Sequence, residues 1–250
     1  MAKERIISTV DPETRHMHKS RSNYRDGYKA HLAVEPETGI ITDVELTPAN
    51  TGDGPVGITL LDDDDAVEVF ADSAYGSGPV RADLAERGHT AVIKPWPTAR
   101  NPYLDDDQFR RDEFRIDYTA RTVTCPNGHT VTIAAGGTTS FGSRCVGCPV
   151  RSRCTANNNG RVFTVGEHDE LLAAARADRR AGIGVDDYRQ WRPLVERSIA
   201  WLVADGHRRV RYRGVERNRL GLHIRAAVIN LRRLLNLGLT HTANGWSLAT

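Results

Sequence analysis

Two carboxylates, Asp72 and Glu196, occupy positions where acidic side chains could do chemistry. Asp72 directly follows a compact apolar run at residues 66–71 and precedes a turn that contains glycine. Open α/β sheets build their sites at the carboxyl ends of such strands, although an aspartate there also commonly caps a turn. Glu196 lies beside the apolar face of a helical segment, with Arg192 one turn before it. For Glu196 taken alone, an ordinary ion pair on a helix is the simpler interpretation.

Four cysteines form a second group that could do chemistry. Cys145 and Cys148 have the spacing of a metal knuckle, Cys154 follows six residues later, and Cys125 begins the string CPNGH, which ends at His129. Four thiolates could close a tetrahedral structural zinc site, and His129 could replace one of them. An iron–sulfur cluster and reduced, packed thiols are the alternatives.

Arginine is concentrated near the carboxyl end of the chain. The net charge over 250 residues is only +2, but residues 186–236 hold twelve arginines against five acidic residues. Arginine provides a fixed charge that suits phosphate, whereas a solvated helical face would need no ligand. The candidate DNA-binding residues are Arg192, Arg197, Arg208 and Arg209. Two further groups could contact DNA or be solvated: His16, His18, Lys19, Arg21 and Arg25 before the first strand pair, and Arg144, Arg151 and Arg153 around the cysteines.

The elements that would position these residues begin with β structure. Alternating polar and apolar residues at 28–34 and 40–46 flank a turn with Pro36 and Gly39, which predicts a hairpin. After a break at residues 47–54 the chain predicts a strand, a short helix and a strand, at residues 66–71, 79–87 and 90–94. Hairpin, strand, helix and strand in this order indicate an α/β fold.

The rest of the chain divides into a loop-rich middle and a helical end. Residues 95–180 contain all four cysteines together with clusters of Pro, Asn and Gly, which we interpret as an inserted module. Residues 191–203, with an apolar stripe of Trp191, Val195, Ile199 and Leu202, and residues 220–239 predict two long helices. Pro193 is expected in the first turn of its helix or at a kink. The predicted domains are residues 1–94, the inserted module 95–180, the helical part 181–240 and a tail, 241–250.

Composition excludes several classes of protein. A hydrophobic fraction of 39% with 26% charged residues is ordinary for a folded, soluble domain and argues against a disordered chain. No apolar run reaches the ~18 residues of a membrane helix, and the apolar part of the N-terminus is too short for a signal peptide. We therefore expect a cytoplasmic protein without membrane contacts. In that compartment cysteines bind metals or remain free thiols more often than they form disulfides.

Several strings resemble one known family. FADSAYG at residues 70–76 resembles the second-aspartate motif of bacterial insertion-sequence DDE transposases, and WRPLVER at residues 191–197 resembles their glutamate motif. Further similar strings are DGYKAHLAV at 26–34, VELTPAN at 44–50 and LHIRAAVINLRRLLNLGL at 222–239. The order and spacing extend across nearly the whole chain, and the cysteine-bearing insertion resembles one branch of the family.

The resemblance implies a ribonuclease H-like α/β core with a catalytic site for DNA transposition. In that family three carboxylates hold two Mg²⁺ or Mn²⁺ ions, which activate water and later a DNA 3′-hydroxyl for attack on a phosphodiester. Asp72 and Glu196 match two of the three ligands. The implied partners are the transposon ends and the target DNA, and the full-length protein is expected to be a homodimer. Arg192 matches the arginine that accompanies the glutamate, whereas Tyr188 is displaced by one position and Val203 replaces the lysine.

The third ligand is missing from this pattern. In the family the first aspartate ends a strand before the hairpin and is usually followed by Ser or Gly and then Thr. No such string occurs here, and Asp11-Pro12-Glu13 resembles a separate family motif. We expect the C-terminal portion of a catalytic domain that lacks its first strand; the alternative is that Ile6–Val10 and Asp11 supply both strand and ligand.

Two other acidic features, Asp53 and the run Asp62–Asp65, have simpler interpretations than a metal site. Asp53 lies where the family often has an aspartate near the catalytic end, but a turn residue explains it equally. The run Asp62–Asp65 predicts a surface turn and no metal site.

The functional alternatives to an active transposase are a non-catalytic DNA-binding remnant and a decayed reading frame with no folded role.

Overall fold

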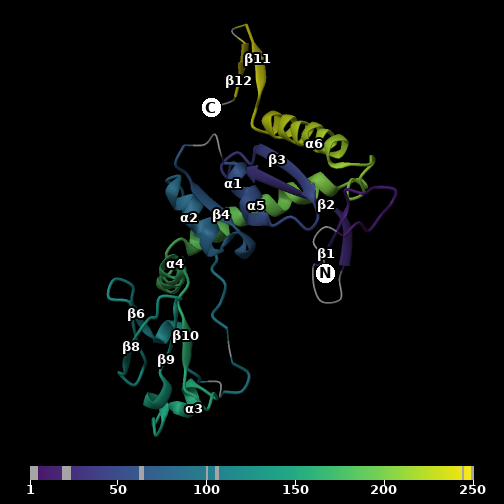
Figure 1. Cartoon of the computed structure of the whole chain (residues 1–250). Helices are drawn as coiled ribbons and strands as arrows, with labels where there is room; N and C mark the ends of the chain where they lie inside the picture. The colour runs from purple at the N-terminus through teal and green to yellow at the C-terminus, as the bar shows by residue number, and fades with distance from the viewer. Residues whose placement is uncertain are drawn as a thin grey trace. The chain divides into compact units, whose positions relative to one another are not determined.

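A computed structural model describes residues 5–18, 24–61, 65–99, 101–104, 107–243 and 245–248. Lys19 and Arg21 of the basic stretch and Asp62–Asp64 of the acidic run lie outside these residues. The fold is mixed α/β, with six helices in the described residues and several small sheets (Figure 1). The chain forms two compact units. Unit 1 contains Met1–Tyr75, Asp83–Ile93 and Gly184–Thr250, and unit 2 contains Gly76–Ala82 and Lys94–Ile183.

The predicted hairpin is confirmed in unit 1. Strands β2 (Tyr24–Val34) and β3 (Ile41–Pro48) pair antiparallel. The turn between them closes through a hydrogen bond from the Gly39 N–H to the Glu35 carbonyl, with Gly39 at a φ of 73°, where a β-carbon would be strained.

A strand that the sequence did not predict extends this sheet. β1 (Arg15–His18) pairs with the beginning of β2. His16 and His18 therefore belong to β1 and Arg25 to β2, so these three residues of the basic stretch lie in strands and not in a solvated loop.

The predicted strand–helix–strand segment is also confirmed. β4 (Glu68–Ala71) and β5 (Thr90–Ile93) are parallel, and the 3₁₀ turn η1 (Ser73–Tyr75) and the helix α2 (Gly78–Glu86) connect them. Parallel strands need such a crossover, because a tight turn can join only antiparallel neighbours. In the described residues β4 and β5 form a sheet of their own, separate from the hairpin sheet.

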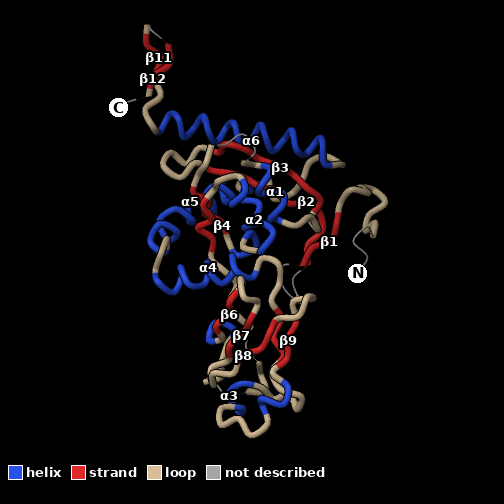
Figure 2. The backbone as a smooth tube through the Cα atoms, turned by 60° about the vertical axis from the view of Figure 1, so that its left-hand side comes forward, coloured by secondary structure: helices blue, strands red, loops and turns tan. Residues whose placement is uncertain are grey.

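Three helices complete the core of unit 1: α1 (Asp53–Thr59), α5 (Val185–Val203) and α6 (Val215–Asn236). α5 lies against β2 and β4, and α6 lies along β3 (Figures 1 and 2). The buried cluster consists of Ile41, Val44, Leu202, Ala226 and Ile229. Burial of these side chains, roughly 1.5–3 kcal/mol for each large one, holds both long helices against the hairpin.

The prediction of which α5 side chains are buried is wrong in one respect. Ser198 is fully buried, whereas Ile199, which the apolar stripe placed inside, is 40% exposed. Burial of the Ser198 hydroxyl is tolerated because it donates to the Leu194 carbonyl and accepts from Arg233 Nη2. α5 also begins earlier than predicted, so Pro193 lies in the helix interior and not in its first turn.

Unit 2 is built from short strands and turns around its own core. Its elements are η2 (Arg111–Glu113), β6 (Arg115–Asp117), β7 (Thr122–Thr124), β8 (Thr130–Thr132), β9 (Thr138–Ser140), η3 (Gly142–Cys145), α3 (Arg151–Cys154), β10 (Val162–Thr164) and α4 (Asp169–Ala181). The core contains Phe114, Val123, Phe141 and Phe163 together with Cys145 and Cys154. α4 was not predicted, although DELLAAARADRRA is rich in helix-forming residues.

The end of the chain carries one more small sheet. Part of the predicted tail folds as a hairpin of β11 (Thr240–Thr242) and β12 (Gly245–Ser247). No helix in the described parts of the chain is long and apolar enough to cross a membrane.

Candidate active site

Asp72 and Glu196, far apart in the sequence, meet at one arginine. Asp72 follows β4, and Glu196 lies on α5 one turn after Arg192. Arg192 Nη2 is 3.6 Å from Asp72 Oδ2, and its Nη1 is 3.8 Å from Glu196 Oε1. The packing of α5 against β4 therefore creates a single acidic site from the two motifs.

The two carboxylates of the site are exposed to solvent, whereas its arginine is largely buried. The side chain of Arg192 is 17% exposed, whereas those of Asp72 and Glu196 are 49% and 70% exposed. Asp72 Oδ1 accepts the Ala74 N–H at 2.8 Å, which fixes one oxygen and leaves the other toward Arg192. Both carboxylates can thus be reached by a ligand from solution.

Tyr75 connects this site to a second polar group. Burial raises the pKa of the Tyr75 hydroxyl, and the negative charges of Asp53 and Asp72 raise it further, so Tyr75 lies within electrostatic range of both aspartates. Its ring packs so closely on α1 that a β-carbon on Gly57 would stand 2.5 Å from Tyr75 Cε1. Gly57 is therefore needed for this ring position.

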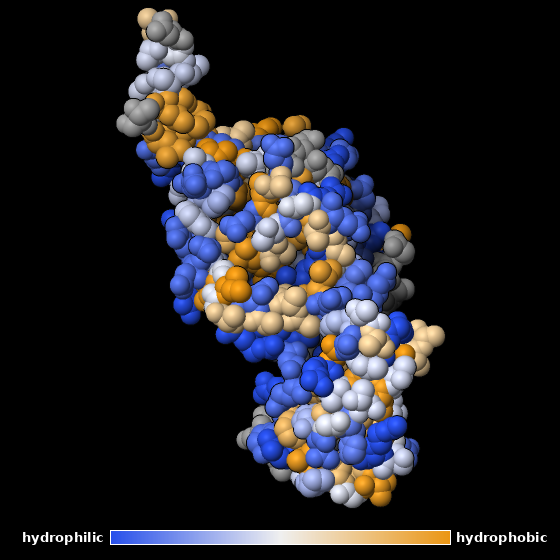
Figure 3. Space-filling model, turned by 90° about the vertical axis from the view of Figure 1, so that its left-hand side faces the viewer, coloured by the Kyte–Doolittle hydropathy of each residue, from blue (hydrophilic) through white to orange (hydrophobic). Residues whose placement is uncertain are grey.

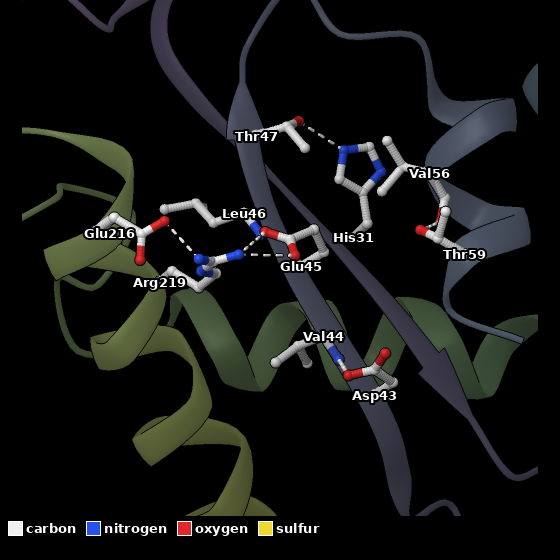
Figure 4. Close-up of polar contacts among 10 residues, drawn as sticks. All are labelled: His31, Asp43, Val44, Glu45, Leu46, Thr47, Val56, Thr59, Glu216 and Arg219. Carbon is white, nitrogen blue, oxygen red and sulfur yellow. Dashed lines mark hydrogen bonds and ion pairs between the residues drawn. The ribbon is translucent and has the colours of Figure 1, made fainter. Parts of the chain in front are cut away.

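The second polar group is centred on Asp53 and was not predicted as a site. Lys29 Nζ pairs with the Asp53 carboxylate at 2.8 Å and donates to the Thr51 carbonyl at 2.9 Å. His31, also on β2, lies 3.8 Å from Asp53 through Nδ1, and its Nε2 shares a hydrogen bond with Thr47 Oγ1 at 2.9 Å (Figure 4). The alternation in YKAHL could have revealed this group, because it places Lys29 and His31 on the same face of the strand.

His31 should make stability depend on pH. Its side chain is 1% exposed, and burial is the main cause of the lowered pKa of its imidazole. With a lowered folded pKa, the unfolded chain binds the proton more strongly. The free energy of unfolding should therefore fall as pH drops below 6.5, by at most about 1.4 kcal/mol per pH unit. Chemical denaturation from pH 7.5 to 5.5 would measure this slope; it should shrink in His31→Gln and persist in a control, His241→Gln. An unchanged slope in His31→Gln would contradict the assignment.

The alternative third ligand, Asp11, is engaged elsewhere. Residues 6–10 form no strand. The Asp11 carboxylate accepts the Tyr28 hydroxyl at 2.8 and 2.9 Å and the Gly214 N–H at 3.2 Å. Glu13 accepts the Val215 N–H at 2.7 Å, so both acids serve the beginning of α6. This placement contradicts the interpretation of Ile6–Val10 and Asp11 as a substitute strand and ligand: the pair stabilises a helix N-terminus.

The carboxylates suit a hard divalent ion, but the set is incomplete. Oxygen ligands such as those of Asp72 and Glu196 are the ones that Mg²⁺ prefers. Among the described residues, however, no group of three or more His, Cys, Asp or Glu side chains stands close enough to hold a metal.

Comparison with protein families shows which family the chain belongs to. A family model described as Transposase DDE domain matches residues 5–231, a span that includes both carboxylates, Arg192 and the hairpin. The chain belongs to the transposase DDE domain family. No curated protein and no solved structure matches it. The resemblance found in the sequence motifs is thereby confirmed at the level of the family.

The four cysteines of this transposase-family chain line one pocket in unit 2. Burial raises the pKa of the Cys154 thiol to about 11, and the other three cysteines add to this rise while Arg161 opposes it. The Arg161 N–H points to Cys145 Sγ at 3.5 Å. Thiolates are ligands that zinc accepts, but among the described residues no group of three or more His, Cys, Asp or Glu side chains could hold a metal ion, so the zinc site stays a prediction.

The arginines of the transposase-family chain divide into exposed and engaged groups. Arg197, Arg208 and Arg209 are exposed, whereas Arg192 faces the carboxylates. Beside the cysteines, Arg151 donates to the carbonyls of Cys145 and Asn157, and Arg153 binds Asp107. These two arginines connect the loops of unit 2 through hydrogen bonds and an ion pair. The sequence alone predicted only DNA contact or solvation for them.

Proposed function

We propose that the chain is a transposase of insertion-sequence type, which acts in the cytoplasm on transposon ends and target DNA and catalyses phosphodiester cleavage and strand transfer with Mg²⁺ or Mn²⁺. The observation that carries this proposal is the convergence of Asp72 and Glu196 on Arg192. We also propose that unit 1 represents a ribonuclease H-like core, that residues 95–180 are an inserted module, and that the working enzyme is a homodimer.

Each group at the site has a chemical role in this proposal. Asp72 and Glu196 would hold the divalent ion, which when bound supplies charge stabilisation for the attacking and leaving oxygens. Arg192 neutralises the two acids when no ion is present and lies where it can contact a DNA phosphate once they are engaged. Lys29 and Asp53 position the end of the hairpin beside Tyr75.

The third carboxylate belongs to the proposal as well. Asp11 is committed to Tyr28 and α6, and Asp53 to Lys29. We propose that the first aspartate lies on a further strand of the ribonuclease H-like core, one that is not among the described strands β1–β12, as the family resemblance implies. Cleavage then requires that strand in addition to Asp72 and Glu196.

The loop between α5 and α6 is the proposed surface for the DNA backbone. His207, Arg208, Arg209, Arg211 and Arg213 follow one another there and are all exposed. Residues 204–214 hold four arginines against one acid, Asp205, which gives the loop a positive field. Such a field attracts phosphates without reading sequence.

DNA binding through this loop should depend on salt. Replacing Arg208 and Arg209 by alanine should weaken binding to every duplex and reduce the slope of log K against log salt by about 1 for each phosphate that the variant no longer neutralises. Fluorescence anisotropy between 50 and 200 mM salt would measure the slope. The control is Arg115→Ala, an exposed arginine on β6. Equal slopes in the wild type and the double variant would contradict the assignment of this loop as a DNA-binding surface.

We further propose that Cys125, Cys145, Cys148 and Cys154 hold a structural zinc ion. The shared pocket supports this proposal, and so does the Arg161 N–H, since amide donors stabilise a metal-bound thiolate. An iron–sulfur cluster would use the same thiols. Metal analysis of the purified protein separates the two, because one contains zinc and the other iron.

A second function, a DNA-binding protein without catalysis, is favoured by the engagement of Asp11 with Tyr28 and Gly214, away from the other two acids. The test is incubation of the chain with duplex and pre-nicked transposon ends in Mg²⁺ and in Mn²⁺. Metal-dependent nicking or joining supports the transposase. Salt-sensitive binding without either product supports the second function.

A further inference from the structure

The outer face of α6 carries an exposed apolar stripe that the proposed chemistry does not use. Its members are Leu220, Ile224, Ala227, Val228, Leu231 and Leu235, here called the α6 stripe. The five large side chains are each 54–63% exposed. Spacings of three and four residues place them all on one side of the helix.

This face is distinct from the side of α6 that builds the core. Ala226, Ile229 and Arg233 point inward and are buried against the hairpin and α5. Arg219 ties the inner side to β3 through Glu45 at 3.3 Å (Figure 4). Figure 2 shows α6 along the outside of unit 1, with no described element on its far side. α6 is thus apolar on two faces but packed on one.

An exposed apolar patch along a helix is a candidate interaction surface. Along one edge of unit 1, Figure 3 shows orange, hydrophobic atoms at the outer surface. Between Leu220 and Leu235 the charged residues are three arginines, and all three turn toward unit 1: Arg225 donates to the carbonyls of Trp201 and Leu202, Arg232 lies over the Trp201 ring at 5.4 Å, and Arg233 is buried. A second apolar helix could therefore approach without meeting a charge.

The spacing of the stripe residues indicates that this second helix is another copy of α6. Successive members are four, three, one, three and four residues apart, so the spacing is the same in both directions. Two copies of α6 laid antiparallel would therefore bring Leu220 against the partner's Leu235 and Ile224 against the partner's Leu231. Residues that exchange contacts in this way are the mark of an interface with two-fold symmetry.

We infer that the α6 stripe is the surface through which two copies of this chain pair, with their α6 helices antiparallel. This inference rests on the proposed homodimer and names its interface. Asp72, which follows β4, and Glu196, which lies on α5, are not part of the α6 stripe.

The ends of α6 enlarge the contact. The seam is about 22 Å long and about 10 Å wide, less than the roughly 800 Å² that each partner buries in a typical stable interface. Val210 and Tyr212 are exposed just before α6, and Trp246 is exposed just after it. Antiparallel pairing places the loop before α6 of one copy near the hairpin that follows α6 in the other, which adds aromatic area at both ends.

The first test is the mass of the full chain in solution. Sedimentation equilibrium of the wild type should give twice the chain mass of 27.7 kDa at micromolar concentration. Leu231→Glu should raise the dissociation constant at least about a hundredfold, because it would bury an unpaired carboxylate. The control is Val146→Glu, which places the same charge at an exposed apolar residue of unit 2 and should stay dimeric. Circular dichroism would confirm that each variant is folded.

The second test is complementation, which fixes the direction of pairing. Ile224→Lys alone should be monomeric, like Leu231→Glu. Mixed together, the two variants should form a heterodimer, because antiparallel pairing sets the glutamate of one chain against the lysine of the other. Parallel pairing would set both against apolar side chains and give no rescue.

The possible results separate the inference from the function it rests on. A wild type that stays monomeric up to 100 µM overturns both the homodimer and the α6 interface. A dimeric wild type with a dimeric Leu231→Glu variant overturns the interface alone, and monomeric variants that fail to complement overturn the antiparallel pairing. The cleavage and DNA-binding assays are read separately and do not affect these outcomes.

Discussion

Replacing Asp72 by asparagine is expected to lower the affinity for Mn²⁺ at least tenfold and, in any assay where the wild type nicks DNA, to reduce Mn²⁺-dependent nicking about a thousandfold, without loss of DNA binding. Asparagine keeps the size of the side chain and can still accept the Ala74 N–H, so the local fold should persist. It loses the charge that would hold the divalent ion, and an ion at such a site contributes several kcal/mol of transition-state stabilisation. Glu196→Gln should have a similar effect for the same reason.

The matched control is Asp187→Asn, an exposed acid in the first turn of α5. Nicking of a pre-cut transposon end, resolved on a denaturing gel, gives the rate. Calorimetric titration with Mn²⁺ provides a readout that does not need activity, and the affinity should fall at least tenfold in Asp72→Asn and not in the control. If Asp72→Asn nicked DNA and bound Mn²⁺ as well as the wild type does, the site assignment would be wrong.

If the cysteines hold the proposed zinc ion, its removal is expected to unfold unit 2. Structural zinc binding contributes about 10–16 kcal/mol at neutral pH, as much as or more than the whole stability of a typical domain. A strong chelator, or Cys145→Ser, should therefore abolish the thermal transition of unit 2 and expose its loops to protease. The ligating thiolates must protonate as the metal leaves, so zinc should be released progressively as pH falls.

Metal content and protease sensitivity would check this prediction. Elemental analysis should find one zinc per wild-type chain, none in Cys145→Ser, and one in the control Val146→Ala, a neighbouring exposed residue. Limited proteolysis should cut residues 125–160 only after chelation. A wild type purified without zinc or iron whose melting is unchanged by chelator would establish the cysteines as packed thiols.

Local sequence patterns determined much of unit 1. The hairpin, β4, α2 and β5 follow from alternation and from glycine at turns, which act between neighbours in the chain. The acidic motif residues were also identifiable, because their strings resemble the family whose model matches the chain. α4 was missed although its composition favours a helix, because the Pro, Asn and Gly clusters that precede it indicate loops.

The sequence by itself thus determined the family and the order of the hairpin, strand, helix and strand in unit 1, and it predicted the two acidic motifs. Only the tertiary structure decided that these acids share Arg192, that Asp11 serves α6, and that Lys29 and His31 gather at Asp53. It also decided that Ser198 is buried in place of Ile199. The physical reason is the range of the forces involved. Backbone propensity and periodicity are local, whereas the partner of a charge or hydroxyl depends on which distant segment packs beside it.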